Sequence, residues 1–235
     1  MASLHLLLIE ADNSHSLGGS CIRDLNNLYN YAKKFSEDKK IPISQSVVLS
    51  IDNDNKIQSK FTNSTFDKLS NYKSAFTSFI SNIKSTDYVI ISISGHGYQK
   101  RSSKQEESDM LDEYISYGNG IIVDNEMYSL LVSKLSFTKR TICLADTCHS
   151  GTIFDNTVNN TNVYSISACL DNQLDSCDIG NNTGFGGALT VHLLDEPNAI
   201  STLLLGNNDD IKNLIKKIEN IMKPLGQAPN LIIPL

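Results

Sequence analysis

Six stretches of the chain are near-continuous runs of apolar, often β-branched residues, each of the length of a β-strand. The four strongest runs are residues 4–9, 47–51, 88–94 and 141–145, and the two weaker ones are residues 163–167 and 231–233. Because these runs do not alternate with polar residues, they suit strands that are buried on both faces of a sheet. The chain is thereby restricted to folds in which a sheet is covered on both sides.

Between these runs lie segments in which apolar residues recur at helical spacing. These segments are residues 21–35, 66–83, 127–135 and 211–222. The alternation of strands and helices predicts an α/β fold, with a mostly parallel sheet of about six strands and helices on both faces. The polar segments 53–64 and 155–162 read as loops that are too short to tether separate domains. We therefore expect a single domain over residues 1–235.

The net charge, the cysteines and the lengths of the apolar runs narrow the classes of function and location that we expect. The formal net charge of −6 gives no basic surface for nucleic acid or an anionic membrane. The five cysteines are widely spaced and contain no CxxC pair, which favours free thiols in a reducing compartment, so we expect a cytoplasmic protein. No run is long enough for a signal sequence or for the roughly 20 apolar residues of a transmembrane helix.

Two of the strongest predicted strands end in sequences that carry reactive side chains. The run at residues 88–94 continues into Gly95-His96-Gly97, and the run at residues 141–145 continues into Asp146-Thr147-Cys148-His149-Ser150-Gly151. In open parallel sheets the carboxyl ends of the strands form one edge, where binding sites gather. We therefore expect the imidazole and the thiol to lie close together.

These residue types favour nucleophilic catalysis. A thiol attacks a carbonyl only as the thiolate, so it needs a nearby base, and Cys148 with His96 supplies such a pair. The N–H groups of Gly97 and Cys148 could bind the developing oxyanion. His149 is a poorer base, because consecutive side chains on extended backbone point in opposite directions. Alone, either residue is more often structural, but their joint position predicts catalysis.

The two motifs, in this order, resemble the pair of catalytic motifs of metacaspases, which are caspase-like cysteine peptidases. Other parts of the chain are similar to that family in its first helix, its small-subunit half and its last strand, namely residues 19–24, 165–173, 187–190 and 227–231. The resemblance implies a caspase-like fold with a large-subunit-like part (1–155) and a small-subunit-like part (156–235). It also implies a catalytic domain without a pro-domain, because the first strand begins within the first few residues.

Substrate preference follows from the acid next to the nucleophile. Asp146 lies two residues before Cys148, so on strand backbone both side chains face the same way. A carboxylate there would repel acidic substrates and pair with Arg or Lys. The resemblance implies that Asp24 joins Asp146 in this pocket, with Cys21 and Ser94 lining it, and predicts cleavage of proteins or peptides after Arg or Lys. Alternatively, Asp24 is a helix N-terminal charge that complements the helix dipole.

The distribution of basic residues predicts that the protein acts as one chain. No Lys or Arg occurs between Arg140 and Lys212, so an enzyme that cuts after basic residues could not divide itself at residues 155–162. The exposed candidates for self-cleavage are Lys100, Arg101 and Lys104, in the polar loop expected after His96. The resemblance favours a monomer.

A calcium site is implied by the same resemblance. Acidic residues are dense after His96, and calcium prefers clustered carboxylate and carbonyl oxygens. Matched by position, the ligands would be Asp112, Asp124, Asn125 and Asp155. Asn125 stands where the family usually has Asp, and the lost charge should weaken affinity. The alternative is a solvated charged loop.

Three other functions remain open. A catalytically silent caspase-like scaffold or regulator would keep the fold without using the dyad. A nucleotide binder would need more than Gly18-Gly19 after the first strand, because no GxGxxG or GxxxxGK[ST] motif occurs. A zinc site at Cys148 and His149 would need a second ligand pair, which the sequence does not offer at a suitable spacing.

Overall fold

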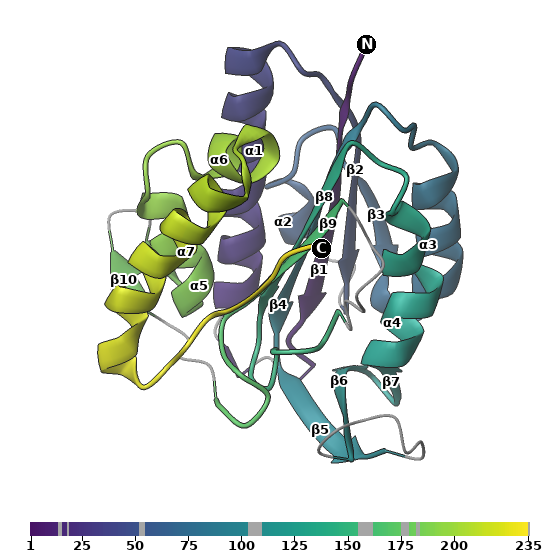
Figure 1. Cartoon of the computed structure of the whole chain (residues 1–235). Coiled ribbons are helices and arrows are strands. Elements are labelled where there is room, and N and C mark those ends of the chain that lie inside the picture. The colour runs from purple at the N-terminus through teal and green to yellow at the C-terminus, as the bar shows by residue number, and fades with distance from the viewer. Residues whose placement is uncertain are drawn as a thin grey trace.

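The computed structural model describes residues 1–13, 16–17, 19–51, 55–102, 110–154, 162–174, 179–181 and 184–234. A seven-stranded sheet forms its centre, in the order β12-β9-β8-β4-β1-β2-β3 (Figure 1). Its strands are β1 (Leu4–Ala11), β2 (Ile43–Ser50), β3 (Thr65–Lys68), β4 (Tyr88–Gly95), β8 (Arg140–Asp146), β9 (Val163–Ser167) and β12 (Asn230–Ile232). Every neighbouring pair is parallel except β12 with β9. The predicted α/β fold is confirmed, with one strand more than expected.

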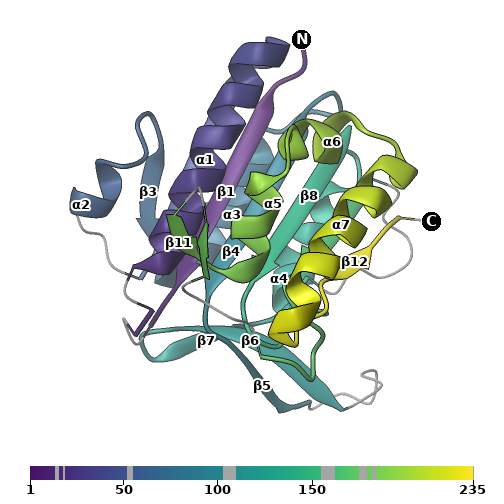
Figure 2. The ribbon, with the colours of Figure 1, turned by 90° about the vertical axis from the view of Figure 1, so that its left-hand side faces the viewer.

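Two smaller sheets accompany the central one. An antiparallel sheet of β5 (Gly97–Arg101), β6 (Leu111–Tyr117) and β7 (Gly120–Val123) lies beyond the carboxyl ends of the central strands (Figure 2). A short antiparallel pair is formed by β10 (Ile179–Asn181) and β11 (Gly184–Gly186). The three-stranded sheet starts directly after His96, so it forms part of the edge where the site was expected.

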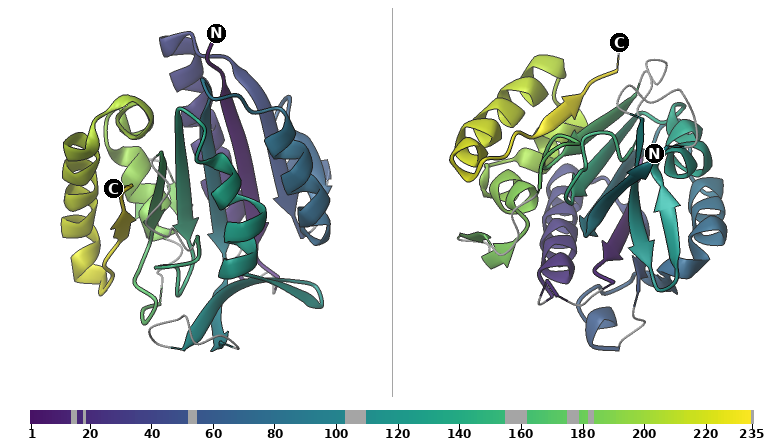
Figure 3. Two further views of the ribbon diagram at one scale, coloured as in Figure 1. Left: turned by 45° about the vertical axis from the view of Figure 1, so that its right-hand side comes forward. Right: turned by 90° about the horizontal axis from the view of Figure 1, so that it is seen from below.

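Helices cover both faces of the central sheet (Figure 3). On one face lie α1 (Ser20–Lys39), α5 (Ala188–Asp195), α6 (Ala199–Leu205) and α7 (Asn208–Met222), and on the other lie α3 (Tyr72–Ser81) and α4 (Asp124–Leu130). The short helical segments are α2 (Asn55–Gln58), η1 (Leu69–Asn71), η2 (Val132–Leu135) and η3 (Lys223–Leu225). None of the helices in the described ranges combines the length and the apolarity that crossing a membrane requires.

The largely apolar character of β1 follows from this layering. Leu4, Leu6 and Leu8 belong to the hydrophobic cluster under α1, whereas Leu7 and Ile9 belong to the cluster under α3. All five side chains are fully buried, and each such burial stabilises the fold by about 2 kcal/mol. Both faces of the strand are therefore largely apolar, with His5 and Glu10 as the exceptions, so the pattern of alternation is lost.

Some predicted elements are wrong in extent. The segment 66–83 was expected to be one helix, but its first residues form β3, and α3 begins only at Tyr72. β3 pairs with the edge of β2, and this tertiary pairing outweighs the local helical spacing. Lys100 and Arg101 lie in β5 and not in a loop, paired with β6, whereas Lys104 lies outside the described residues. The expected loop at 53–64 contains α2.

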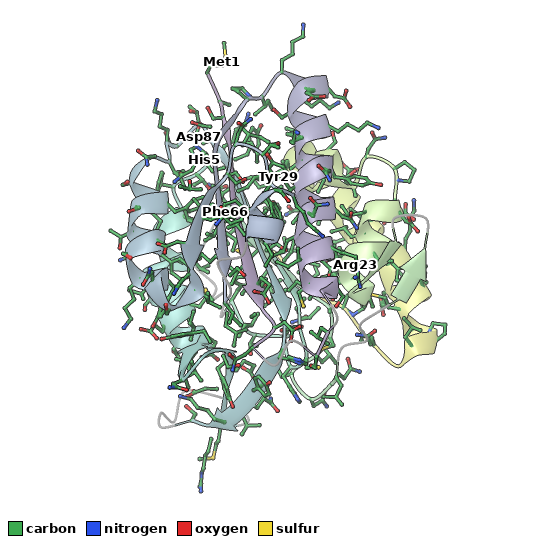
Figure 4. All side chains as sticks on the ribbon, turned by 180° about the vertical axis from the view of Figure 1, so that it is seen from behind. Met1, His5, Arg23, Tyr29, Phe66 and Asp87 are labelled. Carbon is green, nitrogen blue, oxygen red and sulfur yellow. The ribbon has the colours of Figure 1, made fainter. Side chains whose placement is uncertain are left out.

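The amino end of the sheet holds a buried pair of a histidine and an aspartate. His5 Nε2 lies 3.0 Å from Asp87 Oδ2, near Met1 and away from Arg23 at the start of α1 (Figure 4). Asp87 also accepts the N–H groups of Ser3 and Lys84, both at 2.9 Å. Burial raises the pKa of Asp87, but these hydrogen bonds and His5 outweigh burial and leave the pKa below its usual value. The pair ties the first residues of the chain to the turn before β4.

Candidate active site

The loops that follow β4 and β8 meet beyond the edge of the sheet. Ser94 and Asp146 are aligned partners in the parallel ladder, so His96 and Cys148 each come two residues after an aligned pair. The two loops are in contact, because a Cβ atom added at Gly97 would collide with the carbonyl oxygen of Cys148. The structure therefore brings together the segments that carry the predicted imidazole and thiol.

His96 is half-buried and is held from the side of β1. Its backbone N–H donates to the carbonyl oxygen of Ala11 at 3.0 Å. Its ring nitrogen Nε2 lies 2.8 Å from Ser16 Oγ and 3.5 Å from Asp12 Oδ1. Asp12 and Ser16 were not included in the sequence analysis, and Asp12 directly follows β1, which is two residues longer than the predicted strand at 4–9. The end of β1 thus contributes polar groups to the site.

Cys148 differs from the other described cysteines in its exposure. Cys21, Cys143 and Cys169 are buried free thiols, whereas Cys148 is half-exposed. Burial raises the pKa of Cys21, Cys143 and Cys169, which keeps these three sulfurs protonated. Cys177 lies outside the described residues. Among the described thiols, Cys148 is the one that a substrate in solvent can reach.

His149 has a left-handed backbone conformation and contacts the loop after β9. Its φ of 50° is in the left-handed region, so the extended geometry assumed in the sequence analysis does not apply. The ring nitrogen Nδ1 lies 2.5 Å from the carbonyl oxygen of Asp171, and the backbone N–H donates to the carbonyl oxygen of Gln173 at 3.0 Å. These contacts anchor the ring to the loop after β9.

The four residues expected to line a pocket lie together. Ser94 Oγ donates to Asp24 Oδ2 at 2.8 Å, and a hydrogen bond also links Ser94 with the thiol of Cys21. Burial first, and the neighbouring carboxylate of Asp146 second, raise the pKa of Asp24 well above its usual value. Asp24 and Asp146 are 2% and 4% exposed, so two acids share one largely dry space.

The amino end of α5 contacts both acids. The N–H of Gly187 donates to the Asp24 carboxylate at 3.0 Å, and the N–H of Thr190 donates to Asp146 Oδ2 at 2.7 Å. A Cβ atom at Gly187 would lie 2.4 Å from the Asp146 carboxyl carbon, and one at Gly186 would collide with Asp24 Oδ1. Only glycine leaves room for the two carboxylates here, a constraint that the sequence analysis did not recognise.

One carboxylate oxygen in this pocket has no hydrogen-bond partner among the described residues. Asp146 Oδ1 is buried and has no hydrogen bond to any residue within the described ranges. An unpaired buried acceptor costs about 1–3 kcal/mol, and more when it is charged. Two crowded acids with an open acceptor are therefore suited to a cationic ligand that brings several N–H donors.

The region expected to bind calcium is only partly described. Asp112 is buried in β6, and its Oδ1 has no hydrogen-bond partner within the described part of the chain. Asp124 accepts the backbone N–H of Glu113 at 3.2 Å and that of Asn125 at 2.5 Å. Asp155 lies outside the described residues.

Around these acids no complete metal site is formed by described residues. Across the described ranges, no group of three or more His, Cys, Asp and Glu side chains is arranged to hold a metal ion. Asp112 Oδ2 lies 4.0 Å from Lys100 Nζ, so one of its oxygens faces a cation of the chain. The orphaned Asp112 Oδ1 nevertheless fits a cation that is coordinated by oxygen.

The sequence matches the profile of one protein family and several curated proteins named after it. The profile of the metacaspase peptidase C14 domain matches residues 7–157. Metacaspase-1 of Pyricularia oryzae is 28% identical over 79% of this chain, but the match covers only 44% of that protein, so the chain spans less than half of its length. Metacaspase-2 of Trypanosoma brucei brucei is 27% identical over 93% of this chain and 68% of its own.

A solved structure resembles the fold of this chain. The crystal structure of protein GSU0716 from Geobacter sulfurreducens superposes with a TM-score of 0.63, covering 100% of this chain and 94% of that one at 20% identity. At this identity the likeness concerns the fold alone. The family match, in contrast, covers well over half of the chain and includes both strand ends described above. This chain therefore belongs to the metacaspase peptidase C14 family.

Proposed function

We propose that this chain is a cysteine endopeptidase that cleaves after Arg or Lys, with Cys148 as the nucleophile and His96 as the base. The observation that supports the proposal is the contact between the loops after β4 and β8, in which the backbone of Cys148, whose thiol is half-exposed, meets Gly97 next to His96. Membership in the family supports the same chemistry.

The proposed reaction has two stages. His96 takes the proton of Cys148, and the thiolate attacks the carbonyl carbon of the scissile peptide bond. The oxyanion is bound by the N–H groups of Gly97 and Cys148, and His96 returns the proton to the leaving amine as the C–N bond breaks. Water then attacks the thioester, gives its proton to His96 and releases the new carboxylate, after which the sulfur regains its proton.

The proposed preference for Arg or Lys rests on the paired acids. A guanidinium placed between Asp24 and Asp146 would separate two like charges and would supply a donor to the unpaired Asp146 Oδ1. An acidic substrate side chain would instead add a third negative charge to a buried site. The planar fork of Arg matches two carboxylates better than the point charge of Lys does.

A panel of short fluorogenic peptides tests the proposal. Peptides that end in Arg, Lys, Asp or Leu before the reporter should be cleaved in the order Arg, then Lys, with Asp and Leu not turned over. An arginyl chloromethylketone should also modify Cys148, as read by mass spectrometry. Lack of turnover and of labelling would favour the catalytically silent scaffold, and cleavage after Asp would refute the pocket assignment.

We further propose that the chain acts as one unprocessed, cytoplasmic monomer. The large-subunit-like part supplies Asp24 and the small-subunit-like part supplies Gly187, and these residues already contact each other within one chain. The four described free cysteines suit a reducing compartment. A single band of full mass after incubation with substrate, and a monomer mass in light scattering, are the expected results.

The contact at Gly97 gives a specific expectation. Gly97→Ala should lower kcat/KM for an Arg peptide by about 100-fold, because the added methyl group needs the space of the Cys148 carbonyl and displaces the nucleophile. Gly118→Ala is the matched control, since φ is 50° there and open space surrounds the position, so it costs stability alone. Equal activity of the two variants would contradict the role of Gly97.

We also propose that calcium stimulates the enzyme by binding near Asp112 and Asp124, with weak affinity because Asn125 replaces an acid. The support is the buried Asp112 Oδ1, which has no hydrogen bond within the described ranges, and the buried carboxylate of Asp124, which accepts the N–H group of Glu113, the residue after Asp112. When bound, the ion would supply positive charge that orders β6 and the start of α4. The chain's own part is to offer carboxylate oxygens at this position.

Calcium binding can be measured without activity. Millimolar calcium should raise the melting temperature of the wild type, because a ligand that binds the native state stabilises it. In Asp112→Asn, about tenfold more calcium should be needed to produce the same shift and any stimulation of turnover, since one charged ligand is lost. Asp38→Asn, an exposed acid near the end of α1, removes the same charge as a control. Identical shifts in all three proteins would refute the site.

A further inference from the structure

The carboxylate of Asp12, at the end of β1, points at the imidazole of His96. Asp12 Oδ1 lies 3.5 Å from His96 Nε2, and Ser16 Oγ lies 2.8 Å from the same nitrogen. Asp12 is 4% exposed, so this charge acts in a space with little water to screen it. The two polar groups contact a single nitrogen of the ring.

Asp12 is fixed in place by hydrogen bonds that do not involve His96. Its Oδ1 and Oδ2 accept the backbone N–H groups of Ser16 at 3.2 Å and Leu17 at 3.0 Å. Its own N–H donates to Glu10 Oε1 at 2.9 Å, while Glu10 Oε2 accepts Ser50 Oγ at 2.7 Å. The carboxylate is therefore positioned by the ends of β1 and β2, before any substrate binds.

These contacts select one tautomer of the ring. The carboxylate of Asp12 can accept a hydrogen bond but cannot donate one, so it favours a proton on Nε2, and the Ser16 hydroxyl can accept from the same N–H group. On this ground we assign the proton to Nε2. Nδ1 is then the nitrogen that exchanges a proton with the sulfur of Cys148. When that proton arrives, the imidazolium lies next to the negative charge of Asp12, which stabilises the charged ring and hence the thiolate.

Other titratable groups around the pair come from three further elements. The ring of Tyr98 in β5 lies 6.1 Å from that of His96, and Tyr98 is stacked on Tyr114 of β6. Cys169, after β9, is close enough to Cys148 for the two to interact electrostatically. Among these groups of the described residues, Asp12 is the carboxylate that lies within 3.5 Å of the His96 ring.

The geometry points to Asp12 as a positioning residue that, together with Ser16, holds His96 in the tautomer that accepts the Cys148 proton and stabilises the resulting thiolate–imidazolium pair. This inference rests on the proposed roles of His96 and Cys148. It adds a side-chain carboxylate to the dyad, so that the site has the order Cys148, His96, Asp12.

The decisive measurement is the alkylation of Cys148 by iodoacetamide across pH 4–10, followed by peptide mapping so that only this sulfur is counted. In Asp12→Asn the apparent pKa of the Cys148 thiol should move upward relative to the wild type, and alkylation near pH 6 should slow by about tenfold. For an Arg peptide, kcat should fall roughly 10- to 100-fold while KM stays the same. Ser16→Ala should shift both readouts in the same direction by less.

Asp87→Asn is the matched control, because it removes the same charge from the other buried Asp–His pair at the far end of the sheet. It should leave the alkylation profile unchanged even if it lowers the melting temperature. Wild-type profiles for both Asp12→Asn and Ser16→Ala would overturn the inference, as would an equal shift in Asp87→Asn. Since alkylation needs no peptide turnover, the role of Asp12 is decided even if the proposed peptidase activity fails, and Ser16→Ala decides it if Asp12→Asn does not fold.

Discussion

Replacing Cys148 by alanine should abolish hydrolysis of Arg peptides, with a fall in kcat of about 10⁴-fold or more. The reason is that the thioester cannot form without the sulfur, and the oxyanion donors and the pocket alone supply little of the acceleration. A loss of this size corresponds to about 5.5 kcal/mol of transition-state stabilisation. Because Cys148 is half-exposed, the free energy of unfolding should change by less than about 1 kcal/mol.

Cys143→Ala should give the opposite result to Cys148→Ala, with lower stability and unchanged turnover. Cys143 is fully buried in the core beneath α3 and α4, so removing its sulfur leaves a cavity and should cost about 1–2 kcal/mol of stability. Its peptide turnover should match that of the wild type, measured well below the melting temperature. Residual turnover in Cys148→Ala above about 1% of the wild-type rate would assign the nucleophile to another group.

Asp24→Asn should lower kcat/KM for Arg peptides by about 100-fold, or about 2.7 kcal/mol, because one of the two charges facing the substrate cation is lost. The free energy of unfolding of Asp24→Asn should not fall along with its activity. Burial and Asp146 raise the pKa of Asp24, so its ionisation is unfavourable in the native state. A neutral amide of the same shape relieves that cost, and the free energy of unfolding near pH 8 should stay the same or rise.

The pH dependence of the wild type follows from the same raised pKa. The native state binds this proton more tightly than the unfolded state does, so the contribution of Asp24 to stability is complete below the unfolded pKa near 4 and is lost as pH rises through the native value. Substrate affinity changes in the opposite sense, because protonating Asp24 at lower pH removes a charge from the pocket. KM for Arg peptides should therefore rise as pH falls.

Denaturant titrations at several pH values, with kinetics on an Arg peptide, measure both effects. In Asp24→Asn the pH-dependent loss of stability and the rise in KM should both be reduced, whereas Asp87→Asn should retain them. A large drop in the stability of Asp24→Asn together with normal KM would mean that Asp24 serves the helix α1 terminus and not the substrate.

Much of the fold could be predicted from local sequence because the strongest strands are buried on both faces. In β1, β4 and β8 most side chains belong to one of the two hydrophobic clusters, so each strand is largely apolar on both faces and stands out without any knowledge of its neighbours. β3 could not be predicted in this way. It lies at the sheet edge with half-exposed side chains, and its pairing with β2 depends on a neighbour distant in sequence.

For the candidate site, too, the sequence and the tertiary structure determined different features. The sequence alone determined that a thiol, an imidazole and the carboxylate of Asp146 follow the ends of predicted strands, and its resemblance to the family pointed to Asp24 in the first helix. Tertiary structure decided which of these groups touch, because contact between side chains far apart in the chain depends on strand order and helix packing. Only the folded chain places α5 over both acids and turns the end of β1 toward His96, so Gly187 and Asp12 acquire their importance from distance in space and not from any local pattern.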